Sequence, residues 1–151
     1  IQEGLEYIKQ NGLPGGIGAH QLETVKACVA QGLEPDFWMK TLHLKSYLQV
    51  KHELDNTQLT ENEEVMYKNV FCENTQETIS FMESLPQPWI AFKILAAGAI
   101  DPQTGFQHAF ESGADFICVG MYDFQVVENT NIALDVLSSD FKSKRPRPWL
   151  A

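Results

Sequence analysis

The stretch PWIAFKILAAGAI, residues 88–100, is a continuous apolar run interrupted by one lysine, Lys93. Continuous apolar runs are typical of strands that are covered on both faces, as in a parallel sheet. The lysine therefore means either that the strand assignment is mistaken or that a charged side chain has a function at this place. The run ends in small residues, which indicates a tight turn after the strand.

Strand-like and helix-like segments alternate four times along the chain. We expect strands near 16–20, 37–42, 89–95 and 115–120, and helices over 21–32, 74–85, 101–113 and 124–137 after a first helix at 2–10. Asn74 with Glu77, and Asp101 before Pro102, predict two helix starts. The pattern predicts an α/β fold of four consecutive parallel βα units, as a single domain over 1–151.

Such units fit either a small doubly wound sheet or half of a (β/α)8 TIM barrel, and the small residues at the strand ends favour the half barrel. Four strands cannot close a barrel. The chain begins without a methionine and inside a helical pattern. We therefore expect either self-association or a preceding amino-terminal half barrel, which could also carry a targeting segment.

Composition excludes some classes of partner. The net charge of −9 argues against nucleic-acid binding, and no apolar run reaches the roughly 20 residues that span a bilayer. Three cysteines without paired spacing are expected to be reduced, and we expect a cytoplasmic protein that binds a small molecule. The basic tail, 141–151, is interpreted as a solvated end.

Two glycine-ended strands carry a resemblance. The segments KILAAGAI (93–100) and GADFICVGM (113–121) resemble the last two strands of phosphate-binding, aldolase-type TIM barrels. The resemblance implies that Gly98 and Gly120 let backbone N–H groups approach an anion. The motifs MKTLH and GADFICVGM also resemble an uncharacterised group of bacterial TIM-barrel proteins, which implies a fold but no activity.

The segments DFWMKT (36–41) and IAFKILAAGAI (90–100) resemble the sixth and seventh strands of class I aldolases of the deoxyribose-phosphate type. This resemblance implies that Lys40 is the Schiff-base lysine and Lys93 a helper lysine, with Ala97 and Gly98 at the glycine turn. A long segment, 44–73, replaces the short loop of that family. We interpret it as a lid or specificity loop, or alternatively as an interface insertion.

Alternation with a period of two predicts which side chains enter the barrel. We expect Trp38, Lys40 and Leu42, and likewise Ala91, Lys93 and Leu95, to face inward, with Ile90, Phe92 and Ile94 under the helices. The first strand is expected to turn Gly16, Gly18 and His20 toward the interior. His20, Lys40 and Lys93 should then converge, and each lysine should lower the pKa of the other.

Three functions remain open. The first is an enzyme that acts through a Schiff base on a small carbonyl compound or sugar, with Lys40, Lys93, His20 and His43 as catalytic residues. The second is a metal-dependent sugar isomerase or epimerase that uses His20 and His43, although no tight ligand spacing supports a metal. The third is a non-catalytic sugar- or anion-binding barrel. No cofactor is expected, and Asp123 should either orient the substrate or cap the last helix.

Overall fold

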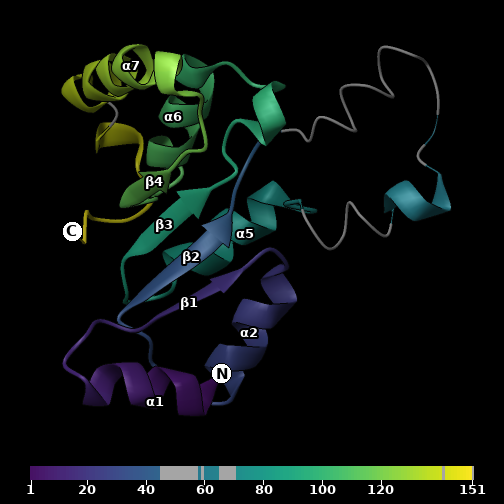
Figure 1. The fold of residues 1–151 in the computed structure, drawn as a ribbon, viewed down its shortest axis with the longest axis vertical. Coiled ribbons are helices and arrows are strands. Elements are labelled where there is room, and N and C mark those ends of the chain that lie inside the picture. Colours follow the sequence, from purple (N-terminus) through teal and green to yellow (C-terminus); the bar gives the residue numbers. More distant parts are fainter. Residues whose placement is uncertain (45–57, 59, 65–70, 141, 151) are drawn as a thin grey trace.

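A computed structural model describes residues 1–44, 58, 60–64, 71–140 and 142–150 of the chain. Within these residues the centre of the fold is a sheet formed by β1 (Gly16–Ala19), β2 (Phe37–Thr41), β3 (Trp89–Phe92) and β4 (Phe116–Cys118). All neighbouring strands are parallel, and their order in space follows the sequence (Figure 1). A doubly wound sheet would have a switch point in this order. The predicted α/β class is confirmed, and the sequential order is consistent with a TIM-barrel-like fold.

Helices alternate with the strands, as predicted. They are α1 (Gln2–Gln10), α2 (Leu22–Ala30), α5 (Thr75–Glu83), α6 (Pro102–Glu111) and α7 (Val126–Ser138), with short 3-10 turns at η1 (Ala96–Gly98), η2 (Asp123–Gln125) and η3 (Lys142–Lys144). Both predicted caps are present, because Asn74 accepts from the N–H of Glu77 and Asp101 accepts from the N–H of Thr104. Most of the expected lid-like segment, 44–73, lies outside the described residues.

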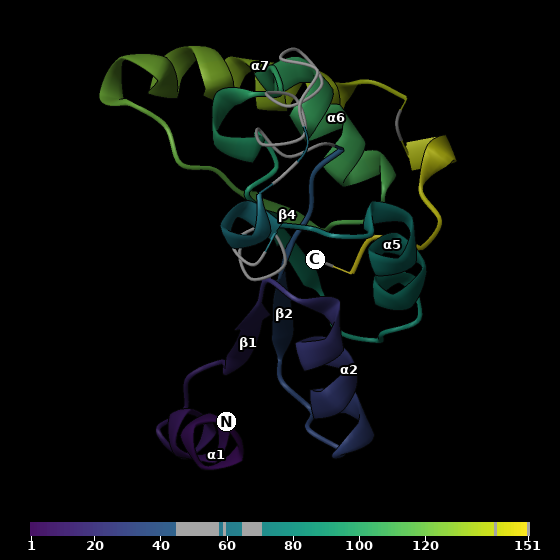
Figure 2. The same ribbon diagram turned by 90° about the vertical axis from the view of Figure 1, so that its right-hand side faces the viewer.

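One face of the sheet packs against α2, α5 and α6 (Figure 2). Residues paired in register across parallel strands project from the same face. Ile17, Trp38 and Trp89 form one such row, and all three are buried in the core. The opposite face is more open, since Gly18, Phe116 and Cys118 are exposed.

The expected orientation of β2 and β3 is therefore wrong. Lys40 is in register with Ala19 and Ala91, and all three lie on the helix-covered face. Ile90 and Phe92 alternate with the buried Trp89 and Ala91, so they lie on the open face instead of under the helices. The expectation placed Trp38 in the barrel interior and did not consider Trp89. These two tryptophans are the largest apolar side chains of the strands and gain most from burial under the helix layer.

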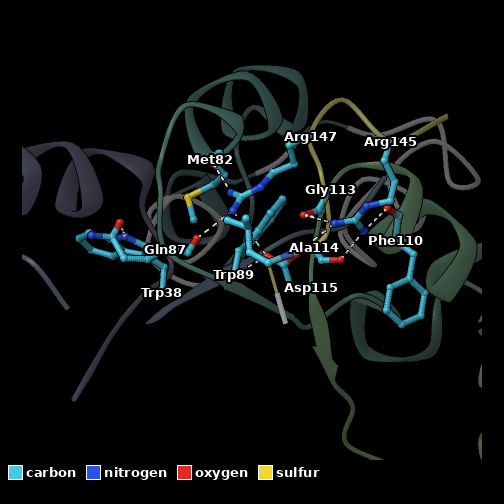
Figure 3. A network of polar contacts seen from close by, with 11 residues as sticks. Trp38, Met82, Gln87, Trp89, Phe110, Gly113, Ala114, Asp115, Arg145 and Arg147 are labelled. Carbon is cyan, nitrogen blue, oxygen red and sulfur yellow. Dashed lines mark hydrogen bonds and ion pairs between the residues drawn. The ribbon is translucent and has the colours of Figure 1, made fainter. Parts of the chain in front are cut away.

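The carboxyl-terminal segment crosses the amino ends of β3 and β4 (Figure 3). Arg145 donates to the backbone carbonyls of Phe110, Gly113 and Ala114 and pairs with Asp115 at 3.1 Å. The guanidinium of Arg145 also stacks on Trp149, with its carbon 4.5 Å from the ring centroid.

The second arginine of this segment, Arg147, reaches a neighbouring helix and strand. It donates to the carbonyls of Met82 and Gln87, and one of its nitrogens lies 3.7 Å from Asp115. We call residues 145–150 together with Asp115 the arginine clasp. The interpretation of the tail as a solvated end is wrong for both arginines, whose side chains are only 3% and 4% exposed.

No helix in the described part of the chain has both the length and the hydrophobicity that a membrane span requires.

Candidate functional site

A cavity of about 720 Å³ opens beyond the carboxyl ends of β3 and β4, and we call it the strand-end cavity. Four of the residues predicted from the sequence to form the site line this cavity, namely Lys93, Ala97, Gly98 and Gly120. Most of the remaining wall is apolar, with Phe71, Phe92, Ile94, Leu95, Ile100, Val119 and Met121 among its residues. Its polar wall includes Asp101, Gln125 and Asn129. A cavity of this size and character suits a small organic ligand.

The backbone that forms one wall of the cavity is strained. Lys93, Ala96 and Ala97 have positive φ angles of 58°, 47° and 59°, and Gly98 follows at 89°. Side chains other than glycine rarely adopt such angles, and strain of this kind concentrates at functional sites. Turn hydrogen bonds hold the segment in place, since Ala96 N–H donates to Lys93 O and Gly98 N–H to Leu95 O, both at 2.9 Å.

This turn explains why Lys93 was misplaced by the alternation argument. β3 ends at Phe92, so the strand period does not extend to the lysine. The positive φ of Lys93 redirects the chain immediately after the strand. The strand expected near 89–95 thus ends earlier, at Phe92, and the Lys93 side chain lines the cavity.

Lys93 is the one lysine or arginine among the described residues that line the strand-end cavity. Its ammonium nitrogen lies 5.4 Å from the centroid of the Phe71 ring, within the range of a cation–π contact. Burial lowers the pKa of Lys93 below its ordinary value. The expected cause, repulsion from Lys40, does not contribute to this shift.

Lys40 has a different environment. Its side chain is 1% exposed beneath the helices, and its ammonium donates to the carbonyl oxygen of Thr41 at 2.9 Å. Burial lowers the pKa of Lys40, and the nearby Cys72 opposes this shift in part. Lys40 lines a separate, smaller cavity of about 100 Å³ between the amino-terminal ends of α2 and α5. The two lysines therefore line different cavities, and Phe71 lines both.

The two predicted histidines lie near both lysines. The Nδ1 atom of His20 is 2.7 Å from the hydroxyl oxygen of Thr41, and its ring centroid is 5.1 Å from that of Phe92. Burial is the main cause that lowers the pKa of His20, and the charges of Lys93 and Lys40 lower it further. His20 interacts electrostatically with both lysines, but it shares the smaller cavity with Lys40, whereas Lys93 lines the strand-end cavity.

His43 is buried and neutral. Its Nε2 atom accepts a hydrogen bond from the backbone N–H of Cys72 at 2.9 Å. Burial, followed by the charges of Lys40 and Lys93, lowers the pKa of His43 to about 4. His43 lines neither of the two cavities described above, so its geometry fits a positioning role better than direct contact with a ligand.

Gly120 and Asp123 lie at the far side of the site. Gly120 lines the strand-end cavity beside Met121 and Tyr122. Asp123 is exposed and accepts from the N–H of Phe124 at 2.8 Å, at the start of η2. The N-cap residue of α7 is Gln125, so the expectation that Asp123 caps the last helix is wrong, and its orientation of a substrate stays a prediction.

Sequence reasoning missed Asn129, which lines the cavity from α7 and is 4% exposed. A signal was present, because Asn129 occupies the first position of the helical stripe that continues with Ile132, Ala133 and Val136. A polar residue in an apolar stripe needs an explanation, as Lys93 does within its apolar run.

The described residues contain no group of three or more His, Cys, Asp or Glu side chains that could hold a metal ion. Comparison of the chain with models of protein families, with curated proteins and with solved structures finds no match.

Proposed function

We propose that this chain binds a small carbonyl compound, such as a sugar or a keto acid, in the strand-end cavity and forms a Schiff base with it through Lys93. The observation that carries the proposal is the position of Lys93, whose lowered pKa and place in the wall of a cavity at the strand ends are both properties of reactive lysines. Active sites of TIM-barrel enzymes lie at the same end of the strands.

The chemistry needs an unprotonated amine. Burial favours the neutral form of Lys93, whose nitrogen attacks the carbonyl carbon and forms a carbinolamine. Loss of the former carbonyl oxygen as water then gives the imine, so the only other product is one water molecule.

Lys93 fits this role better than Lys40, the residue implied by the aldolase resemblance. Lys40 already donates to Thr41 O and lies beneath the helices, next to a cavity of only about 100 Å³. Attack on a substrate from that position would require the helices to move. In this proposal Lys40 acts at a distance, through its positive charge on His20 and His43.

Borohydride trapping tests the proposal. The complete chain is incubated with pyruvate, glycolaldehyde or ribose 5-phosphate, reduced with borohydride and digested, and the adduct is located by mass spectrometry. We expect the adduct on Lys93, its loss in Lys93→Met and its retention in Lys40→Met, which is the matched control.

The alternative functions give different results. A chain that binds one of these compounds in calorimetry but yields no adduct belongs to the non-catalytic, ligand-binding class. Binding that a chelator removes, together with an absence of trapping, would support the metal-dependent isomerase or epimerase. An adduct that persists in Lys93→Met and disappears in Lys40→Met would contradict the assignment of Lys93.

A further inference from the structure

The first turns of α7 place a polar side chain in a position where an apolar one is expected. Asn129 precedes Ile132, Ala133 and Val136 on the inward stripe of the helix, and all three pack on the apolar core. Asparagine is also a weaker helix former than leucine. Neither helix stability nor core packing therefore accounts for an asparagine at this position.

The hydrogen bonding of Asn129 within the protein is weak. Its side-chain amide donates to the thioether sulfur of Met121 at 3.8 Å, and no stronger side-chain partner is present among the described residues. A thioether is a poor acceptor. Neither amide atom of Asn129 is among the buried polar atoms without a partner in the described residues, so the free protein tolerates the amide, but the thioether contact does not explain why an amide stands here.

The position of Asn129 supplies that explanation. The residue lines the strand-end cavity together with Lys93, Gly98 and Gly120, although it comes from a different element, α7. A primary amide offers both donors and an acceptor, and it carries no charge that would compete with Lys93. It is therefore suited to a neutral hydrogen-bonding group of the ligand, which a hydroxyl group provides.

We infer that Asn129 is a specificity-determining residue that hydrogen-bonds a hydroxyl group on the compound bound at Lys93. This inference rests on the proposed function and narrows its substrate class to hydroxylated carbonyl compounds. Apolar walls alone discriminate weakly between ligands that differ by one hydroxyl, whereas a buried amide can discriminate strongly.

The experiment compares pyruvate with hydroxypyruvate, which differ by one hydroxyl group. Calorimetry on the complete chain measures the affinity for each, and borohydride trapping measures adduct formation. We expect hydroxypyruvate to bind more tightly, and Asn129→Leu to reduce that preference by about tenfold, as expected for one hydrogen bond of the stronger kind. Asn131→Leu, an identical change at an exposed position of the same helix, should leave the preference unchanged.

A second readout separates recognition from a structural role. If Asn129 is retained for the ligand, Asn129→Leu should keep or raise the melting temperature of the free protein, because leucine completes the apolar stripe. A fall of several degrees, relative to Asn131→Leu, would overturn the inference in favour of a structural asparagine.

The two proposals fail in different ways. Adducts on Lys93 with a preference that Asn129→Leu does not change would overturn the inference and leave the proposed function in place. A preference that depends on Asn129 without any adduct would support the inference and overturn the Schiff base. If neither keto acid binds, the inference is wrong, and the proposed function is also wrong if glycolaldehyde and ribose 5-phosphate yield no adduct.

Discussion

The Nη2 atom of Arg145 lies 3.1 Å from the Oδ1 atom of Asp115, and both side chains are almost completely buried. A buried ion pair is favourable only when its remaining hydrogen-bonding capacity is largely used. Here Asp115 also accepts from the N–H groups of Trp89 and Leu150. The pair therefore connects the start of β3 and the residue before β4 to the carboxyl-terminal segment (Figure 3).

Removal of the Asp115 carboxylate should be strongly destabilising. We expect Asp115→Ala to lower the free energy of unfolding by about 3–5 kcal/mol, because two guanidinium groups would remain buried without their carboxylate. Urea denaturation measures the loss. The control is Lys144→Ala, which breaks the more exposed pair with Glu111 and should cost less than about 1 kcal/mol. Equal losses of unfolding free energy in the two variants would contradict a stabilising role of the buried ion pair in the arginine clasp.

The buried imidazole of His43 predicts a dependence of stability on pH. Its pKa is lowered from 6.5 to about 4, so between these values the unfolded chain binds the proton and the folded chain does not. Stability is then fully present above pH 6.5 and falls as the pH decreases toward 4. At about 1.4 kcal/mol per pKa unit, the loss is on the order of 3 kcal/mol.

NMR titration of the His43 ring protons should give an apparent pKa near 4. His43→Gln retains an acceptor for the N–H of Cys72 but does not titrate, so this part of the pH dependence should disappear. An unchanged dependence in the variant would assign the effect to other groups.

The turn after β3 should become more stable when its strain is released. Ala97 has a φ angle of 59°, in the left-handed region that favours glycine. We expect Ala97→Gly to raise the free energy of unfolding by about 0.5–1 kcal/mol, since relief of the left-handed conformation exceeds the entropy cost of glycine. Ala99→Gly, two residues later at a φ of −74°, should instead be destabilising by a similar amount. Thermal denaturation distinguishes the two signs.

The sheet edges predict association. In the described part of the chain, β1 and β4 each pair with only one strand, which leaves one edge of each without a strand partner. Open parallel edges tend to pair with other chains. We expect self-association in light scattering at roughly tens of micromolar, and its reduction in Phe116→Lys, which places a charge on the exposed side of β4. Thr130→Lys on the exposed side of α7 is the control, and a stable monomeric wild type would refute the expectation.

The order of the elements was predictable because it depends on local patterns. Apolar runs, the caps at Asn74 and Asp101, and the glycines that follow helices each locate the end of an element to within a few residues. The face on which Lys40 lies was not predictable from alternation alone. Alternation fixes which residues share a face, but burial under α2 and α5 decides which face is covered, and this depends on the tertiary packing of Trp38 and Trp89.

Two further errors have the same origin. The buried state of Arg145 depends on Asp115, 30 residues earlier in the chain, and no local signal announces a contact at that separation. Asn129 was recognisable as a polar exception in an apolar helical stripe. Its place in the wall of the cavity was not predictable, because that cavity is formed by β3, β4 and the turns that follow them.

The arginine clasp also has a consequence for biosynthesis. Residues 145–150 leave the ribosome after all four strands, although the carboxylate that they pair with stands just before β4. A nascent chain that has released β1 to β4 but retains this segment in the exit tunnel carries Asp115 without its guanidinium partners. The strands can meet during translation, but the junction between β3 and β4 becomes locked only after residues 145–150 have left the exit tunnel. Until then the partly assembled sheet is more prone to aggregate.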